Sequence, residues 1–295
     1  MLRVFGHLAV LGMLAPLLTA QALAADADRG VPRVVAFGGS CPGCALGKRK
    51  LTGAAFTGGN FDKSVLAESD LRGATFTATS FRGADFTRAD LRSASLLGVN
   101  FSDAVFAGAR MDGLEGAGPN FSNADLKRAR LTSAELVGAN FWHAALTDAQ
   151  LQGAELVASN LIQVEAVRAD FQGADLTAAK MMKGRFQDAS FKGATLDSAD
   201  LSGGDFARAD FHGASLENTR IFGADFSAAK GLDQDQLDEA CGDASTRLPA
   251  GLVNRPCRSH GFSFKILTPP SPGRPPKPPT PPLPAVAAIR HLVSE

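Results

Sequence analysis

Large apolar residues recur along most of this chain at every fifth position. From Leu46 to Phe226, 37 positions share one phase of the repeat, and 35 of them are Leu, Phe, Met or Ile; the exceptions are Gly116 and Ala166. Two places before each of these positions, Ala occupies 23 of the 37 sites and most of the others hold small residues. An α-helix has a period of 3.6 and a strand a period of 2, so neither produces this spacing.

A chain that turns a corner every five residues accounts for the pattern. The large residue, here called the centre of each unit, and the small residue two places earlier then point into a narrow core, and the other three face solvent. Four corners close a coil of about twenty residues, and successive coils stack at the ~4.8 Å spacing of neighbouring strands. The pattern therefore predicts an all-β solenoid rather than a bundle of amphipathic helices.

The phenylalanines test the number of corners. With four corners, residues twenty apart are stacked neighbours, and Phe gains by pairing with Phe beyond simple area burial. All 15 Phe residues at centres have another Phe twenty residues before or after. The columns are Phe61, Phe81, Phe101, Phe121 and Phe141; Phe171, Phe191 and Phe211; Phe186, Phe206 and Phe226; Phe86 and Phe106; and Phe56 and Phe76. The spacing supports four corners.

The repeated unit resembles that of the pentapeptide repeat family, Ala-(Asn/Asp)-(Leu/Phe)-x-x. Ala84-Asp85-Phe86-Thr87-Arg88 and Ala199-Asp200-Leu201-Ser202-Gly203 carry the full unit. The resemblance implies a right-handed quadrilateral β-helix, which we expect over residues 46–231 in about nine coils. Some cytoplasmic members inhibit DNA gyrase by imitating duplex DNA, so binding to gyrase or another topoisomerase is one alternative function. Between residues 46 and 226, however, 22 acidic and 19 basic residues are interleaved, which does not match a strongly acidic mimic.

Residues 1–24 have the pattern of a secretory signal peptide. Arg3 precedes an apolar run over residues 8–18, and Ala22-Leu23-Ala24 offers a small-x-small cleavage site. The run is too short for the roughly 20 residues that span a bilayer, which argues against a transmembrane anchor. We therefore expect export to the periplasm or the cell exterior, with no transmembrane segment after cleavage.

Caps and a tail are expected around the repeat, because exposed backbone edges of a stacked coil invite aggregation. Residues 25–45 form the predicted N-terminal cap and 232–264 the C-terminal cap, in which a short helix follows Asp233 as N-cap. In the last segment, 265–295, Pro fills ten of the sixteen positions from 269 to 284. This composition predicts a disordered, extended polyproline tail, with docking of residues 286–293 as the alternative.

The four cysteines can form two disulfides in an oxidising compartment. Cys41 and Cys44 occupy inward positions of the first coil, which favours a structural disulfide or a buried thiol pair over an envelope thiol-disulfide enzyme. A second bond between Cys241 and Cys257 would hold the C-terminal cap, and we treat that pairing as a hypothesis.

The charge balance and the remaining side chains argue against two classes of function, nucleic-acid binding and catalysis. The 30 Lys and Arg residues balance 30 Asp and Glu residues, which argues against a general nucleic-acid binder. No nucleophile with its base and no metal-ligand spacing stands out, so we expect no enzyme, no cofactor and no metal.

Residues twenty apart at the solvent-facing positions of the unit form columns on the surface, and these columns contain the candidate sites. Contiguous exposed apolar residues usually mark an interface, and two columns supply a candidate protein-binding face: Trp142, Ile162 and Met182, and Leu97, Val137 and Val157. One column alternates in sign and predicts a ladder of surface ion pairs: Glu68, Arg88, Gly108, Arg128, Asp148, Arg168, Asp188 and Arg208. A fourth column holds an amide ladder: Asn100, Asn120, Asn140 and Asn160. The sequence thus predicts a non-catalytic exported scaffold or interaction module of the cell envelope, bound to an unknown protein partner or to a second copy of itself.

Overall fold

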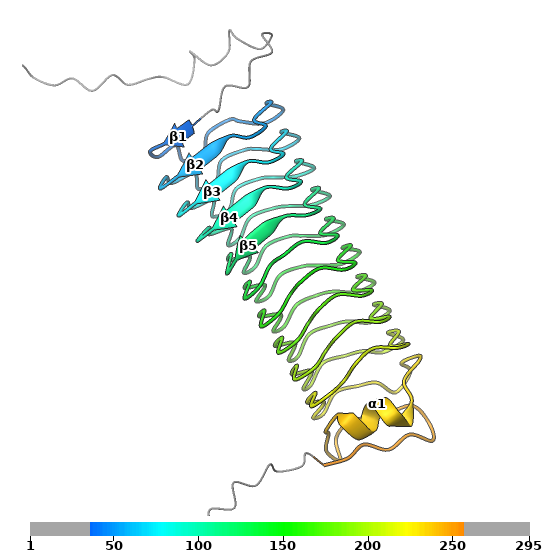
Figure 1. Cartoon of the computed structure of the whole chain (residues 1–295). Coiled ribbons are helices and arrows are strands. Elements are labelled where there is room, and N and C mark those ends of the chain that lie inside the picture. The colour runs from blue at the N-terminus through cyan, green and yellow to red at the C-terminus, as the bar shows by residue number, and fades with distance from the viewer. Residues whose placement is uncertain (1–35, 257–295) are drawn as a thin grey trace, which may run out of the picture. The chain divides into compact units, whose positions relative to one another are not determined.

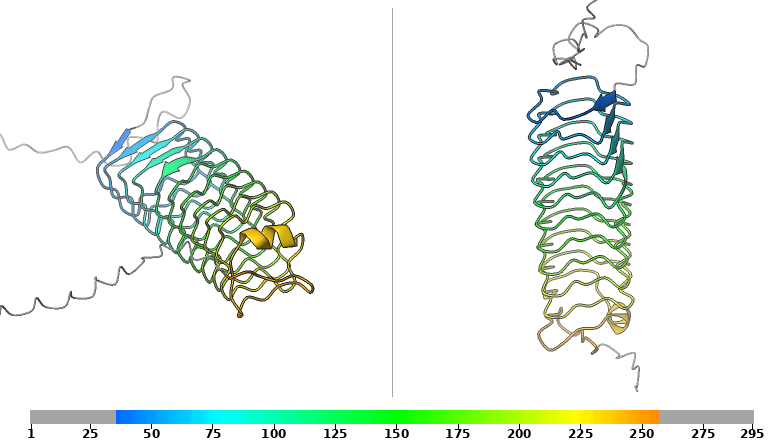
Figure 2. Two further views of the ribbon diagram at one scale, coloured as in Figure 1. Left: turned by 60° about the horizontal axis from the view of Figure 1, so that its bottom comes forward. Right: turned by 90° about the vertical axis from the view of Figure 1, so that its left-hand side faces the viewer.

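The computed structural model describes residues 36–256, which form a parallel β-solenoid of stacked coils (Figures 1 and 2). One side of the first coils is a five-stranded parallel sheet with the order β1-β2-β3-β4-β5. Its strands are β1 (Ala36–Gly38), β2 (Ala55–Thr57), β3 (Thr75–Thr77), β4 (Ser95–Leu97) and β5 (Glu115–Ala117). The predicted signal peptide, most of the first cap, Cys257 and the proline-rich tail lie outside the described residues, so those predictions stay predictions.

Elsewhere the coils are joined by isolated parallel bridges between residues twenty apart, such as Asn100↔Asn120 and Glu135↔Glu155. The backbone N–H of Phe101 donates to the carbonyl of Asn120 at 2.7 Å, and equivalent bonds repeat from coil to coil. The predicted β-solenoid is therefore confirmed, with twenty residues between stacked neighbours.

The centres and the small residues before them fill a continuous core. The rings of Phe121 and Phe141 stack with centroids 5.2 Å apart and planes 7° apart, and those of Phe171 and Phe191 at 5.1 Å and 2°. Phe37 of β1 extends one column by stacking on Phe56 at 4.7 Å. The aromatic columns expected from the twenty-residue spacing are present as stacked rings.

The two exceptions to the repeat keep the register. Gly116 lies in β5 opposite Leu96 of β4, and a Cβ atom at Gly116 would lie 3.0 Å from the Cβ of Leu96. Ala166 is fully buried. Neither position interrupts the stacking of the coils.

Each corner is a tight turn in which the second residue after the centre has a left-handed backbone. Arg88 has φ 56° and Asp188 has φ 60°, a region that costs a residue with a side chain roughly 1–2 kcal/mol. At most corners a hydrogen bond closes the turn, as where the N–H of Ala84 donates to the carbonyl of Phe81 at 3.0 Å. Interstrand hydrogen bonds and core burial offset the backbone strain.

Helix α1 (Gln234–Glu239) covers the last coil at the C-terminal end of the solenoid (Figure 2). Asp233 is its N-cap and forms a capping box with Gln236. The side-chain amide of Gln236 also donates to the carbonyls of Phe211 at 3.0 Å and Ala214 at 2.7 Å. The bond to Ala214 replaces the interstrand bond that a further coil would make, as the N–H of Ser215 makes to the carbonyl of Ala194 at 2.9 Å. After α1 the chain pairs once more with the last coil, Cys241 with Arg220 and Arg247 with Asp225.

Candidate functional site

The solenoid has four sides, each lying between two corners. The chain turns at 137–138 and again at 142–143, and Asn140 lies on the side between these turns. We call this side, which carries the asparagine ladder, the amide side. The column of Trp142 and the column of Val137 occupy its two corners.

The predicted apolar residues differ in exposure and continuity. Trp142 and Val137 are each 41% exposed and Leu97 is 59% exposed, whereas Ile162, Met182 and Val157 are half-buried. The structure brings five of these six residues together on consecutive coils around the amide side.

Leu97 stands apart from the other five. It lies in β4, two coils before Val137, and the position between them in the column is Ala117. At the ~4.8 Å spacing between strands, this leaves a gap of about 10 Å in the apolar column.

The amide side forms a rigid floor between the apolar corners. Asn140 donates from Nδ2 to Oδ1 of Asn120 at 3.0 Å, and Asn160 donates in the same way to Asn140 at 3.0 Å. The same Oδ1 of Asn140 accepts the backbone N–H of Trp142 at 3.2 Å. The ring of His143 meets that of Trp142 edge-on with centroids 4.2 Å apart. The indole therefore sits on a fixed backbone rather than a loose loop.

Acidic residues flank this surface beyond the Val137 corner. Glu115, Glu135 and Glu155 are successive register partners on the neighbouring side of the solenoid. The surface thus combines exposed apolar groups, a central row of amides and an acidic border.

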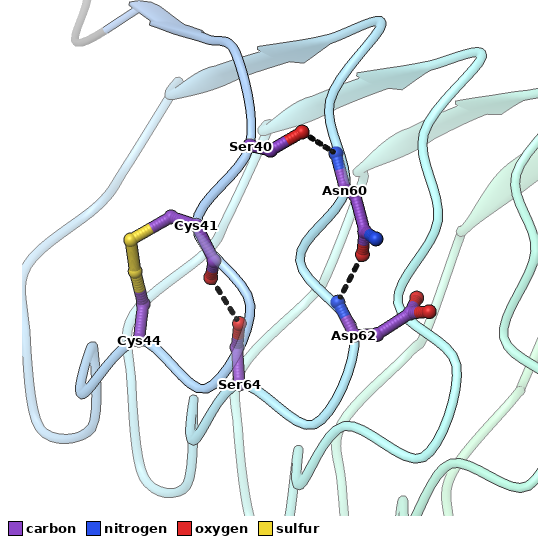
Figure 3. The surroundings of a disulfide bond; sticks show 6 residues. All are labelled: Ser40, Cys41, Cys44, Asn60, Asp62 and Ser64. Atoms are coloured by element: carbon purple, nitrogen blue, oxygen red, sulfur yellow. Dashed lines mark hydrogen bonds between the residues drawn. A yellow bond between two sulfur atoms is a disulfide. The ribbon is translucent and has the colours of Figure 1, made fainter.

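Cys41 and Cys44 are joined by a disulfide in the first coil, with Cα atoms 5.6 Å apart (Figure 3). The N–H of Cys41 donates to the carbonyl of Asn60 at 2.7 Å, and the hydroxyl of Ser64 donates to the carbonyl of Cys41 at 3.1 Å. The bond therefore ties a turn that is already attached to the next coil. The proposed pairing of Cys241 with Cys257 involves a residue outside the described range.

The predicted ion-pair ladder forms only in part. Arg168 pairs with Asp148 at 2.7 Å and Arg208 with Asp188 at 2.7 Å. In each pair the guanidinium hydrogen bond lowers the pKa of the carboxyl group. Within residues 36–256, Arg88 and Arg128 have no carboxylate within 4.0 Å, and Gly108 separates them in the column. The alternation of sign breaks at this glycine.

A second charged cluster lies on the side opposite the amide side, and the sequence analysis did not single it out. Arg72 binds Asp70 with Nε–Oδ1 at 2.8 Å and Nη2–Oδ2 at 2.7 Å, and Arg92 binds Asp90 in the same way. The Arg72 hydrogen bond lowers the pKa of Asp70 to about 2. The recurring Asp-x-Arg at 70–72 and 90–92 was the available signal.

The described residues contain no group of three or more His, Cys, Asp or Glu side chains placed to hold a metal ion.

Among solved structures, the cyanobacterial protein HetL from Nostoc sp. strain PCC 7120, a pentapeptide repeat protein involved in regulating heterocyst differentiation, is similar to this chain. The two share 25% sequence identity with a TM-score of 0.66 over 71% of this chain and 94% of HetL. Trypsin-treated QnrB1, a plasmid-mediated fluoroquinolone resistance protein, shares 20% identity with a TM-score of 0.30 over 72% of this chain and 93% of QnrB1.

Curated proteins give no match to the sequence. The family model for pentapeptide repeats matches in 8 copies, over residues 50–88, 84–115, 117–153, 144–181 and 189–227. These matches cover more than half of the chain and coincide with the five-residue pattern of the solenoid. The chain belongs to the pentapeptide repeat family.

Proposed function

We propose that this protein is a non-catalytic, exported scaffold of the cell envelope that binds a protein partner through its amide side. The observation that carries the proposal is the pair of apolar corners around Trp142 and Val137, both 41% exposed. Exposed apolar groups that are contiguous and bordered by polar residues are typical of interaction surfaces.

The chemistry of this surface defines the partner. Trp142 offers a large ring on a fixed backbone, and aromatic anchors of this kind dominate binding energy at interfaces. The asparagine row supplies amide groups for hydrogen bonds, and Glu135 and Glu155 border it with negative charge. We therefore expect a partner with an apolar ridge and a basic rim.

Export is supported by the signal-like pattern of residues 1–24 and by the Cys41–Cys44 disulfide, since such bonds persist in oxidising compartments. No helix within residues 36–256 is long and apolar enough to span a bilayer. Fractionation of cells followed by N-terminal sequencing tests this part of the proposal. We expect the mature chain in the periplasm or medium to begin at Ala25, and an uncleaved cytoplasmic product would contradict it.

Photo-crosslinking tests the docking surface directly. A photoreactive residue at position 142 is expected to give a discrete adduct with one partner in envelope extracts, and the same residue at position 65 is not. Val65 is a suitable control because it is 43% exposed and lies on a different side of the solenoid.

Paired substitutions then measure the contribution of the apolar corner. Trp142→Asp with Ile162→Asp should remove the adduct formed from position 182, whereas Val65→Asp with Val105→Asp should leave it. Light scattering of the purified protein shows whether this surface binds a second copy of the chain or a different protein. Dimers lost in the Trp142 variant would contradict a distinct partner, and an adduct that persists in that variant would contradict this docking surface.

A further inference from the structure

The side opposite the amide side holds two stacked arginines with few partners. Arg110 and Arg130 are register partners on consecutive coils, and like charges placed directly opposite each other on neighbouring strands are destabilising. Their nearest carboxylates are Asp90, 3.8 Å from Nη1 of Arg110, and Asp112, 3.4 Å from Nε of Arg130.

Two polar atoms at this position are unsatisfied, one on Arg110 and one on Asp112. Nε of Arg110 and Oδ1 of Asp112 are buried and have no hydrogen-bond partner. In the two preceding coils the order Asp-x-Arg allows a two-bond contact within one coil. At 110–112 the order is reversed, and this contact is not made. A buried donor without an acceptor costs free energy, so an anion that reaches Arg110 would be stabilised.

An open depression of about 730 Å³ lies over this cluster. Four arginines line it, Arg72, Arg92, Arg110 and Arg130, together with the carboxylate of Asp112. Arg72 and Arg92 are already paired with Asp70 and Asp90, so four arginines and three carboxylates leave a net charge of 4 − 3 = +1, which lies at Arg110 and Arg130. The adjoining corner leaves the depression open because its side chains are small: Gly73, Ser93, Gly113 and Ser133. The depression therefore combines positive charge, hydroxyl groups and room for a ligand.

The positive charge extends beyond the depression itself. Arg88 and Arg128 stand at the other corner of the same side, and neither has a carboxylate within 4.0 Å among residues 36–256. The fields of these two groups add to that of Arg110 and Arg130 and favour an anionic ligand.

We propose that this depression binds an oligoanion with two or more linked phosphate groups, placed along the solenoid axis over Arg110 and Arg130. The guanidinium group presents a planar fork of donors that matches phosphate oxygens. Coils about 4.8 Å apart place the next arginine within reach of the next group of a condensed phosphate. No aromatic side chain lines the depression, so it offers no platform for the base stacking that single-stranded nucleic acids use.

Calorimetric titration of the full mature chain with orthophosphate, pyrophosphate and tripolyphosphate tests the proposal. At an ionic strength of about 0.15 M, we expect affinity to rise with the number of linked phosphates. Citrate, a tricarboxylate, distinguishes phosphate chemistry from general anion attraction and should bind more weakly than tripolyphosphate. No detectable binding of tripolyphosphate, or equal binding of citrate, would overturn the proposal.

Matched variants locate the site. Loss of two sets of charge-assisted bonds in Arg110→Gln with Arg130→Gln should weaken tripolyphosphate binding more than about tenfold. Arg168→Gln with Arg208→Gln removes the same charge two and four coils beyond Arg128 in the same corner column, farther from the depression, and should change affinity by less than about twofold. Equal loss in both variants would show non-specific attraction and would refute a site at Arg110.

Two further measurements distinguish a loss of phosphate binding from a loss of folding and from a loss of partner docking. Without phosphate, Arg110→Gln with Arg130→Gln should melt no lower than the unmodified chain, because the substitution relieves like-charge repulsion; a large loss of melting temperature would instead assign the pair a structural role. The Trp142→Asp, Ile162→Asp variant should bind tripolyphosphate normally, since its changes lie on the opposite side. Failure of the docking proposal and failure of this proposal are therefore distinguishable.

Discussion

One corner column of the solenoid changes its geometry halfway along the molecule. In the first coils, β2 to β5 run along one side and end at this corner as three-residue strands (Figure 1). In later coils the same corner is a closed turn, where the N–H of Ala139 donates to the carbonyl of Leu136 at 3.1 Å and that of Ala179 to Leu176 at 2.9 Å. We call the two forms the open corner and the closed corner.

The difference correlates with the small position of the unit. The open corner has Gly59, Thr79, Val99 and Pro119 there, and the closed corner has Ala139, Ser159, Ala179, Ala199 and Thr219. Pro119 has no N–H and cannot close a turn. Thr occurs in both forms, however, so residue type alone does not decide the geometry. Each coil must fit the coil beneath it, and the corner form is a property of the stack.

We expect the largest loss in the free energy of unfolding from substitutions at the aromatic centres of the open corner. Phe76 stacks on Phe56 at 4.9 Å and meets Phe81 edge-on at 5.4 Å. Phe76→Ala should lower the free energy of unfolding by about 4 kcal/mol, and Leu176→Ala at the closed corner by about 3 kcal/mol. Thermal denaturation measures both.

Phe76→Leu is the matched control for corner geometry. Leu96 is already the centre of an open corner, so this variant should keep the strand β3 and lose only about 1 kcal/mol. A slowly exchanging amide appearing at Thr79 in this variant would show that the aromatic ring, and not the stack, holds the corner open.

A proline at position 139 tests whether the open corner spreads to the next coil. Gly138 has φ 68°, like Gly118 with φ 61° before Pro119, so Ala139→Pro copies an existing Gly-Pro pair. We expect a loss of about 1 kcal/mol for the turn hydrogen bond. Thermal unfolding and amide exchange of residues 135–138 check it.

Ala154→Pro is the control for this experiment. It also follows a glycine with positive φ, Gly153 at 63°, but the same corner is closed in the coils above and below, at Ala134 and Ala174. We expect it to cost more than about 2 kcal/mol. Equal losses in the two proline variants would contradict a geometry transmitted through the stack.

Both corner forms contain one unsatisfied hydroxyl. Oγ1 of Thr79 and Oγ of Ser159 are buried without a hydrogen-bond partner, whereas Thr219 donates to the carbonyl of Leu196 at 2.7 Å. Ser159→Ala and Thr79→Val should each raise the free energy of unfolding by about 1 kcal/mol, and Thr219→Val should lower it. Chemical denaturation of the three variants provides the comparison, and a loss in all three would argue against unsatisfied hydroxyls.

We expect the smallest change in stability from the pH dependence of the aspartate–arginine pairs in the open-corner coils. Hydrogen bonding to Arg72 lowers the pKa of Asp70 from 3.8 to about 2. A carboxyl group with a lowered pKa in the folded state stabilises the protein above its unfolded pKa, and that contribution disappears as pH falls from about 4 towards 2. The pair is surface-exposed, so we expect less than about 1 kcal/mol. Melting temperatures at about pH 5 and about pH 2.5 should differ less in Asp70→Asn than in the unmodified chain.

The five-residue spacing was sufficient to predict the solenoid, because each centre and each small residue has a single inward direction in a four-cornered coil. The stacked phenylalanines followed from the same arithmetic, as did the clustering of Trp142 with Ile162. The separation of Leu97 from Val137 was available from the same arithmetic, because Ala117 stands between them at the twenty-residue step, although the predicted face includes both residues.

Other features required three-dimensional contacts. Whether Arg88 and Arg128 are paired depends on which carboxylates lie within reach in the folded chain. The reversed order of Arg110 and Asp112 indicates an unpaired arginine only once the neighbouring coils show the two-bond contact of Asp-x-Arg. The open and closed corners were also hidden, since the chain has the same length through both.

The twenty-residue step between register partners limits how this chain can change in length. A deletion of five residues between 145 and 149 would keep every later centre facing inward, yet it would move every later column to the neighbouring side. Glu155 would then occupy the place of Gln150 above Arg130, and Asn160 would join the acidic column. Shortening or lengthening that preserves the amide side and the arginine side must therefore proceed by whole coils.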